Sequence, residues 1–180
     1  MRVLGVDPGT RHLGWGVIER AGPGKVRHVA HGVIHASESA PLAERLVVLE
    51  RGLTAVIDEH KPSAGSVETL FFARDAQAAA KLGHARGVVL LSLARAGVGV
   101  FEYAPSRVKR AVTGHGSASK EQVAQLMNAH LGLALCAGDA ADALANAFAH
   151  LALSQFQEAL VRSGVTLPPP YKPRRGAPRW

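Results

Sequence analysis

The chain has 180 residues, of which 47% are apolar, and its mean hydropathy is close to zero. This size supports one globular domain with a substantial core, and it excludes two large domains. The formal net charge of +7 favours a polyanionic partner, with nucleic acid first. We expect a soluble, cytoplasmic protein, because the chain has a single cysteine, its N-terminal apolar run is broken by Asp7, and its apolar stretches are too short to span a membrane.

The first element is a short apolar run, Val3-Leu4-Gly5-Val6, which ends at Asp7. Such a run is too short for a helix and predicts a strand buried on both faces, with the Asp7 carboxylate at the rim of the sheet. Pro8 and Gly9 then turn the chain, and residues 13–18 alternate large apolar residues with glycine, which predicts an antiparallel partner strand. Taken alone, the Asp-Pro-Gly sequence is equally consistent with a simple turn.

Residues 26–34 predict a third antiparallel strand near an edge of the sheet. A helix is expected to follow, with Ser39 and Pro41 as start signals and Lys61-Pro62 as the stop. Its apolar positions follow helical spacing: Leu42, Leu46, Leu49, Leu53, Val56 and Ile57.

Residues 64–68 are expected to form the next strand, because a right-handed crossover between two helices requires one there. The following segment, 74–96, predicts a long helix that is apolar almost all the way round between Ala76 and Leu93. Because the sheet can cover only one of its faces, the other face is expected to need a second partner.

The second half predicts a strand over 98–103, a short helix over 105–112, a mobile loop over 113–117 and a helix that begins with a Ser119/Gln122 capping box. The last helix is expected to begin near Gly138. Asp139 and Asp142 lie one helical turn apart on a shared face, with Asn146 beside them.

Residues 1–157 are expected to form the folded domain. The segment 164–180 contains three consecutive prolines and no apolar period, so it predicts a disordered tail. Its last nine residues carry four positive charges: Lys172, Arg174, Arg175 and Arg179. That leaves about +3 for the folded part, for which a mildly basic solvated surface remains the alternative to a DNA-binding one.

These elements predict an α/β fold with a mixed five-stranded sheet, three antiparallel strands first and then parallel ones, flanked by helices. Asp7 and Glu68 would end neighbouring strands, and the last helix would add Asp139 and Asp142 at the same rim. Carboxylates about 4 to 6 Å apart repel by roughly 4 kcal/mol per close pair at an effective dielectric constant of 20, so such a cluster favours bound cations. Oxygen ligands select Mg²⁺ or Mn²⁺, and two such ions suit phosphodiester hydrolysis. The alternative for the last two residues is that acids favour a helix N-terminus, by about 0.3 to 1 kcal/mol.

The chain resembles bacterial Holliday junction resolvases of the RuvC type, which have an RNase H-like fold. The resemblance covers roughly residues 2–157. It is carried, in order, by Val3-Leu4-Gly5-Val6-Asp7-Pro8-Gly9-Thr10, Leu82-Gly83-His84-Ala85-Arg86-Gly87, Phe101-Glu102-Tyr103, Gly114-His115-Gly116-Ser117-Ala118-Ser119-Lys120 and Asp139-Ala140-Ala141-Asp142-Ala143-Leu144.

The resemblance implies a homodimeric endonuclease that resolves four-way DNA junctions by paired, Mg²⁺-dependent cuts and works with the RuvA-RuvB branch-migration complex. It places the family's four acidic, metal-binding positions at Asp7, Glu68, Asp139 and Asp142. It also places an aromatic near the junction crossover at Phe71, and basic positions beside the cut strand at Lys109 and Lys120. Without the resemblance, either lysine would be interpreted as a solvated surface residue. The chain departs from the pattern at Thr69, where a glutamine often follows the glutamate, and in the polar strand before Glu68.

Three other classes of protein are consistent with parts of the pattern. Actin-like ATPases and sugar kinases share the Asp-x-Gly-Thr turn, but they need two such domains. Smaller RNase H-like nucleases of ribosomal RNA precursors share the fold, but the long apolar helix and the Asp139/Asp142 pair favour a resolvase. A non-enzymatic junction-binding module is the third, and metal-dependent nicking of a four-way junction would distinguish it.

Overall fold

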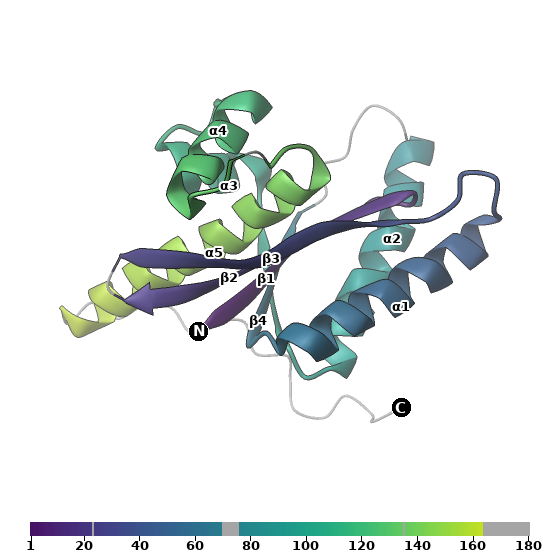
Figure 1. Cartoon of the computed structure of the whole chain (residues 1–180), viewed down its shortest axis with the longest axis horizontal. Helices are drawn as coiled ribbons and strands as arrows, with labels where there is room; N and C mark the ends of the chain where they lie inside the picture. The colour runs from purple at the N-terminus through teal and green to yellow at the C-terminus, as the bar shows by residue number, and fades with distance from the viewer. Residues whose placement is uncertain (23, 70–75, 135, 164–180) are drawn as a thin grey trace.

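The computed structural model describes residues 1–22, 24–69, 76–134 and 136–163. Within them lies one five-stranded mixed sheet with the strand order β3-β2-β1-β4-β5, and helices cover both of its faces (Figure 1). The strands are β1 Arg2–Asp7, β2 His12–Gly22, β3 Lys25–His35, β4 Ala64–Glu68 and β5 Gly99–Tyr103. The helices are α1 Leu42–His60, α2 Ala76–Arg95, α3 Pro105–Thr113, α4 Lys120–Leu131 and α5 Asp139–Arg162. The predicted fold class is confirmed.

The first three strands form an antiparallel meander. β1 pairs with β2 from Arg2 opposite Glu19 to Asp7 opposite Gly14, and β2 continues into β3 with a register shift after Val17. β2 and β3 are both longer than predicted. β3 lies at one edge of the sheet, as expected, and β5 lies at the other.

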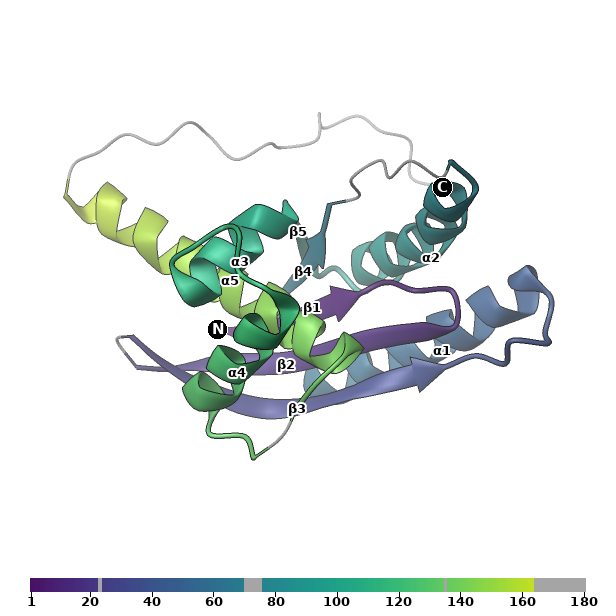
Figure 2. The same ribbon diagram turned by 90° about the horizontal axis from the view of Figure 1, so that it is seen from above.

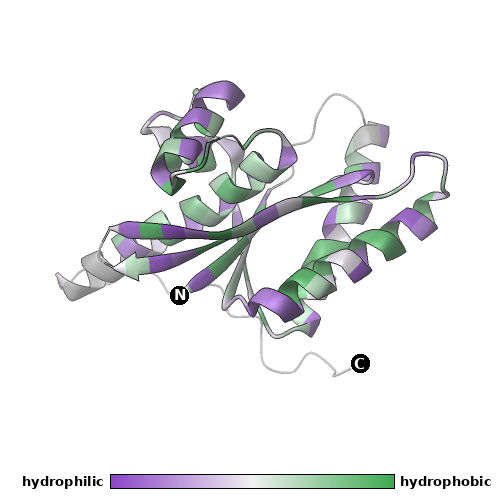
Figure 3. Ribbon diagram, viewed as in Figure 1, coloured by the Kyte–Doolittle hydropathy of each residue, from purple (hydrophilic) through white to green (hydrophobic). Residues whose placement is uncertain are grey.

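The helices divide into two layers, which Figures 1 and 2 show from perpendicular directions. One layer contains α3, α4 and α5, with α5 packed across β1, β2 and β4. Val3, Ile18 and Leu144 are fully buried in this layer. The other layer contains α1 and α2, and its core includes Leu4, Leu49 and Leu93. Alternate residues of β1 therefore supply two separate cores, and Figure 3 shows apolar segments running through the central strands, α1 and α5.

The strand predicted over residues 64–68 is present as β4, and tertiary contacts explain its polar composition. β4 pairs in parallel with β1, Val6 opposite Val67, and with β5 on its other side. Gly65 faces Leu93 of α2, whose side chain would lie 2.7 Å from an added Cβ. Ser66 is fully buried, and its hydroxyl donates a hydrogen bond to the backbone carbonyl of Asn146 at 2.7 Å. Small residues therefore let β4 lie between two helices without voids or clashes.

The helix termini agree with the predictions in most places. Both hydrogen bonds of the Ser119/Gln122 capping box are present, and α5 begins directly after Gly138, whose φ is 65°. Ser39 was expected to help start α1, but Pro41 is the N-cap residue and makes no side-chain bond, while the Ser39 hydroxyl pairs with that of Ser37. Ser39 therefore does not cap the helix, because it lies two residues before the N-cap position.

The predicted long helix corresponds to α2, and residues 74 and 75 lie outside the described part of the chain. Ala85, Val89 and Leu93 are buried against the sheet layer, whereas Leu91 stays 49% exposed. α5 continues to Arg162, beyond the expected domain boundary at residue 157. Among the helices described, none has the length and apolar character needed to cross a lipid bilayer.

Candidate active site

Two strands deliver the first two acidic side chains to one rim of the sheet. β1 ends at Asp7 and β4 ends at Glu68. The two strands are parallel neighbours whose last paired residues are Val6 and Val67. The two carboxylates come directly after this pair, so they lie at the same rim of the sheet, where the strands end. Both residues are partly buried.

Glycines bring α5 unusually close to the sheet. A Cβ added to Gly5 would lie 1.9 Å from the Ala143 carbonyl oxygen, and one added to Gly14 would lie 2.1 Å from that of Asp139. Real Cβ atoms do not come this close to backbone atoms, so only glycine fits beneath the helix at these positions. The close packing places the first turn of α5, with Asp139 and Asp142, over the end of β1 that carries Asp7.

The electrostatics of Asp7 show that the four carboxylates form one group. The pKa of Asp7 is raised to about 7, first by burial and then by the negative charges of Asp142, Asp139 and Glu68, in that order of strength. The pKa of Glu68 is also raised, first by burial and then by Asp142. A site in which like charges oppose ionisation is suited to binding a cation.

Two lysines moderate this negative charge. The Lys120 ammonium lies 2.8 Å from Oδ2 of Asp142, and this hydrogen bond is the largest factor that raises the pKa of Lys120. Lys109 of α3 acts on Glu68, whose pKa its positive charge lowers. The structure therefore brings six of the seven predicted site residues together. Phe71 lies outside the described residues.

Sequence reasoning gave no role to Arg86, which holds the end of β4. Its guanidinium donates a hydrogen bond to the backbone carbonyl of Glu68 at 2.6 Å, and it forms an ion pair with Glu102 on the neighbouring strand. The side chain is only 13% exposed. An arginine in the middle of an otherwise apolar helix was the signal in the sequence, because a buried charge requires a partner.

The donor set fits Mg²⁺ or Mn²⁺, although the carboxylates do not enclose an ion. Among the described residues, no three histidine, cysteine or acidic side chains converge tightly enough to form a closed metal site. Mg²⁺ seldom needs such a cage, since it keeps several waters and is typically held by one or two carboxylates together with substrate phosphates. The four acidic side chains supply only oxygen ligands, which both ions prefer.

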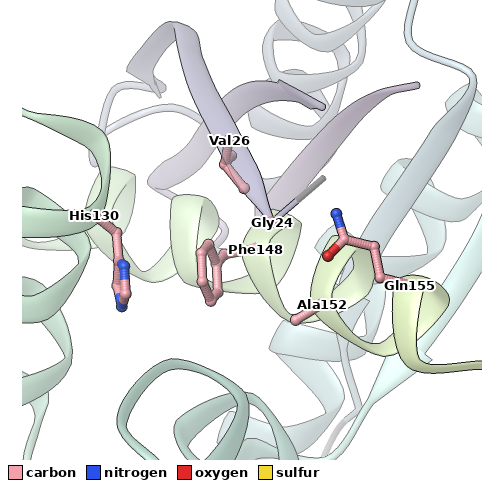
Figure 4. A pocket seen from close by; sticks show the side chains of 6 residues that line it. All are labelled: Gly24, Val26, His130, Phe148, Ala152 and Gln155. Carbon is pink, nitrogen blue, oxygen red and sulfur yellow. The ribbon is translucent and has the colours of Figure 1, made fainter. Parts of the chain in front are cut away.

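A hollow of about 140 Å³ lies further along α5 (Figure 4). Its lining consists of Gly24, Val26, His130, Phe148, Ala152 and Gln155. The Phe148 ring stacks on His130 with 4.9 Å between the ring centroids. This lining lacks the convergent charges of the acidic rim, so the candidate catalytic chemistry belongs to the rim.

Comparison with protein families gives an independent result. The family model described as "Crossover junction endodeoxyribonuclease RuvC" matches residues 3–150. A protein of that name from Sorangium cellulosum is 57% identical over 176 residues, covering 97% of this chain and 98% of that protein. Another from Myxococcus xanthus is 49% identical over 154 residues, covering 84% of this chain and 80% of that protein.

Solved structures give the same result for the fold. The Thermus thermophilus RuvC structure in complex with Holliday junction substrate matches with a TM-score of 0.82 and 39% identity, covering 87% of this chain and 96% of that one. The yeast mitochondrial Holliday junction resolvase Ydc2 matches with a TM-score of 0.62 but only 12% identity, over 89% of this chain and 80% of that one. The second match therefore supports the shared fold alone.

Proposed function

The chain belongs to the RuvC family of crossover junction endodeoxyribonucleases, and from this membership we propose that it resolves four-way DNA junctions during recombination and repair. The reaction is paired, symmetric hydrolysis of phosphodiester bonds in two strands. The observation that supports the proposal best is the mutual influence of Asp7, Glu68, Asp139 and Asp142 at one rim of the sheet.

We propose that these four carboxylates are the catalytic residues and hold Mg²⁺, in two ions per site, with Mn²⁺ able to substitute. Ions bound there would polarise the scissile phosphate and activate a water. Asp7 and Glu68 are placed by the sheet, while Asp139 and Asp142 are placed by a helix that packs directly against Gly5 and Gly14. The protein would therefore supply oxygen ligands whose mutual repulsion is relieved when cations bind.

Basic and aromatic residues around this rim are proposed to hold the DNA. Lys120 already reaches Asp142, and its side chain is 77% exposed, so it can turn towards a phosphate. The positive charge of Lys109, on α3, lowers the pKa of Glu68. Phe71 follows Glu68 closely in sequence, where an aromatic ring can stack on an unpaired base. The basic segment 168–180 adds a salt-dependent contact, so its deletion should weaken junction binding and reduce the salt slope.

We further propose a two-fold symmetric homodimer that works with the RuvA-RuvB complex in the cytoplasm. Paired cuts in strands related by near two-fold symmetry require two active sites in matching orientation. Leu91 on α2 is a large apolar side chain that stays 49% exposed, which supports a second partner for this helix. Sedimentation that shows only an active monomer at micromolar concentration would exclude the dimer.

The decisive experiment compares Asp142→Asn with the wild-type protein on a synthetic four-way junction in Mg²⁺. The substitution removes a negative charge but little volume, so cleavage should be abolished while junction binding is kept or strengthened. Asp58→Asn is the matched control, because Asp58 is exposed on α1 and pairs only with Lys61 among the contacts described. Near wild-type cutting by Asp142→Asn would refute the proposed site, and binding without cutting by the wild type would favour a junction-binding module.

A further inference from the structure

Asn146 lies at the centre of the contact between α5 and the sheet. Only 1% of its surface is exposed. Its side-chain Nδ2 donates a hydrogen bond to the backbone carbonyl of Val6 at 3.1 Å, and its backbone carbonyl accepts the 2.7 Å bond from Ser66. Both bonds are buried and join parts of the chain that are far apart in sequence.

These two bonds connect the three elements that carry the acidic group. Val6 directly precedes Asp7 on β1, and Ser66 is two residues before Glu68 on β4. Asn146 is one helical turn after Asp142 on α5. One residue therefore ties the helix that carries two of the carboxylates to both strands that carry the other two.

We propose that Asn146 is a positioning residue that sets the separation between the α5 carboxylates and those of β1 and β4, and thereby the metal affinity of the site. The inference rests on the proposed function, because it assumes that these carboxylates hold the ions. Groups that orient metal ligands from behind commonly change metal affinity or activity by about 10- to 100-fold when they are removed.

Packing alone does not account for an amide at this position. Nearby on α5, Ala143 and Ala147 make the close contact with Gly5, so small apolar residues suffice for the fit. The Oδ1 atom of Asn146 is buried and has no hydrogen-bond partner among the described residues. A buried polar atom without a partner is unfavourable. The favourable contribution of the Asn146 side chain therefore comes from the hydrogen bond that Nδ2 donates to Val6.

The test measures Mn²⁺ binding to the protein alone by electron paramagnetic resonance, together with junction cleavage in Mg²⁺ and thermal melting. Asn146→Ala should weaken Mn²⁺ binding by about 10- to 100-fold, and it should slow cleavage while leaving junction binding in EDTA unchanged. Ser66→Ala, which removes only the bond to β4, should weaken Mn²⁺ binding less and should fold even if Asn146→Ala does not.

The structural control is Leu151→Ala. Leu151 is buried on the same helix, 1% exposed, but belongs to the apolar core beyond the acidic turn. It should lower the melting temperature and leave Mn²⁺ affinity unchanged. The inference is overturned if both Asn146→Ala and Ser66→Ala bind Mn²⁺ as the wild type does, or if Leu151→Ala weakens binding as much as they do. Wild-type affinity in Asp142→Asn would instead show that the proposed metal site is wrong, and the inference would fail with it.

Discussion

The ammonium nitrogen of Lys120 on α4 lies 2.8 Å from Oδ2 of Asp142 on α5, so the lysine forms an ion pair with a carboxylate that is a candidate metal ligand. The ammonium and a metal ion would compete for the same oxygen. Lys120→Gln should therefore tighten Mg²⁺ binding by about 1.5- to 5-fold, the range expected for a largely exposed ion pair. Cleavage should nevertheless slow, because the proposed contact of Lys120 with DNA is lost.

The competition is checked by Mg²⁺ titration with calorimetry and by cleavage at saturating Mg²⁺. Lys61→Gln is the matched control, since Lys61 forms a similar 3.0 Å pair with Asp58 and lies before the start of β4, at the opposite end of that strand from Glu68. Weaker Mg²⁺ binding by Lys120→Gln would contradict the competition.

Asp7→Asn should stabilise the metal-free protein at high pH. The pKa of Asp7 is about 7 in the folded protein and near 3.8 when unfolded. The folded state therefore binds the proton more tightly, and the wild type loses stability as the pH rises from about 4 to 7. At pH 8 the variant should be more stable by about 2 to 4 kcal/mol, with little difference at pH 4. Urea unfolding in EDTA measures this, and added Mg²⁺ should stabilise the wild type more than the variant.

Gly5→Ala should damage both stability and cleavage. The new Cβ would meet the backbone of α5 at Ala143 and Ala147, which cannot move as a flexible side chain can. Overpacking of this kind costs about 1 to 3 kcal/mol or more, and the shift of α5 should reduce cleavage. Gly83→Ala is the control: it lies within α2, where an added Cβ meets no described atom, and it should stabilise the protein by about 0.5 to 1 kcal/mol. Thermal melting and junction cleavage distinguish the two.

His150 should make the fold sensitive to acid. It is 2% exposed, its Nδ1 pairs with the Tyr103 hydroxyl at 2.8 Å, and burial followed by the charge of Arg20 lowers its pKa to about 4. The unfolded chain therefore binds the proton more readily below pH 6.5, so stability falls as the pH drops towards 4. Between pH 7 and 5 this group should cost roughly 2 kcal/mol. The pH dependence of urea unfolding should be shallower by that amount in His150→Gln, and equal slopes would contradict the burial effect.

Phe71→Ala distinguishes a DNA contact from a core residue. If Phe71 stacks on a base at the crossover, a loss of about 1 to 3 kcal/mol should weaken junction binding or cleavage by roughly 5- to 150-fold with unchanged melting. If it is a core residue, unfolding should become easier by about 3 to 5 kcal/mol. Melting and cleavage are measured on the same variant, and no change in either would exclude both roles.

Local patterns predicted those parts of the fold that depend on neighbouring residues. The Ser119/Gln122 capping box and the strand that ends at Asp7 were predicted in this way, and both are present. The sequence also predicted the glycine face of β2 but not its purpose, since only the structure shows α5 resting on Gly14.

The remaining features depend on contacts between distant segments. The polarity of β4 has no local explanation, because Ser66 is satisfied by a carbonyl eighty residues later. Asn146 was expected beside the acids on the polar face of the helix, but it is buried beneath them. Arg86 gave a signal in the sequence, but its partner, the Glu68 carbonyl, could not be inferred from spacing.

The late position of α5 in the chain also has a consequence for when the proposed active site can be completed. Asp7 is among the first residues that a ribosome releases, whereas Asp139 and Asp142 emerge only after the other helices and the whole sheet. Because domains fold during synthesis, a nascent or prematurely terminated chain that lacks α5 carries only half of the acidic group. If the four carboxylates are the proposed catalytic group, an incomplete polypeptide should not cut DNA, and catalytic competence should arise only when the final helix docks.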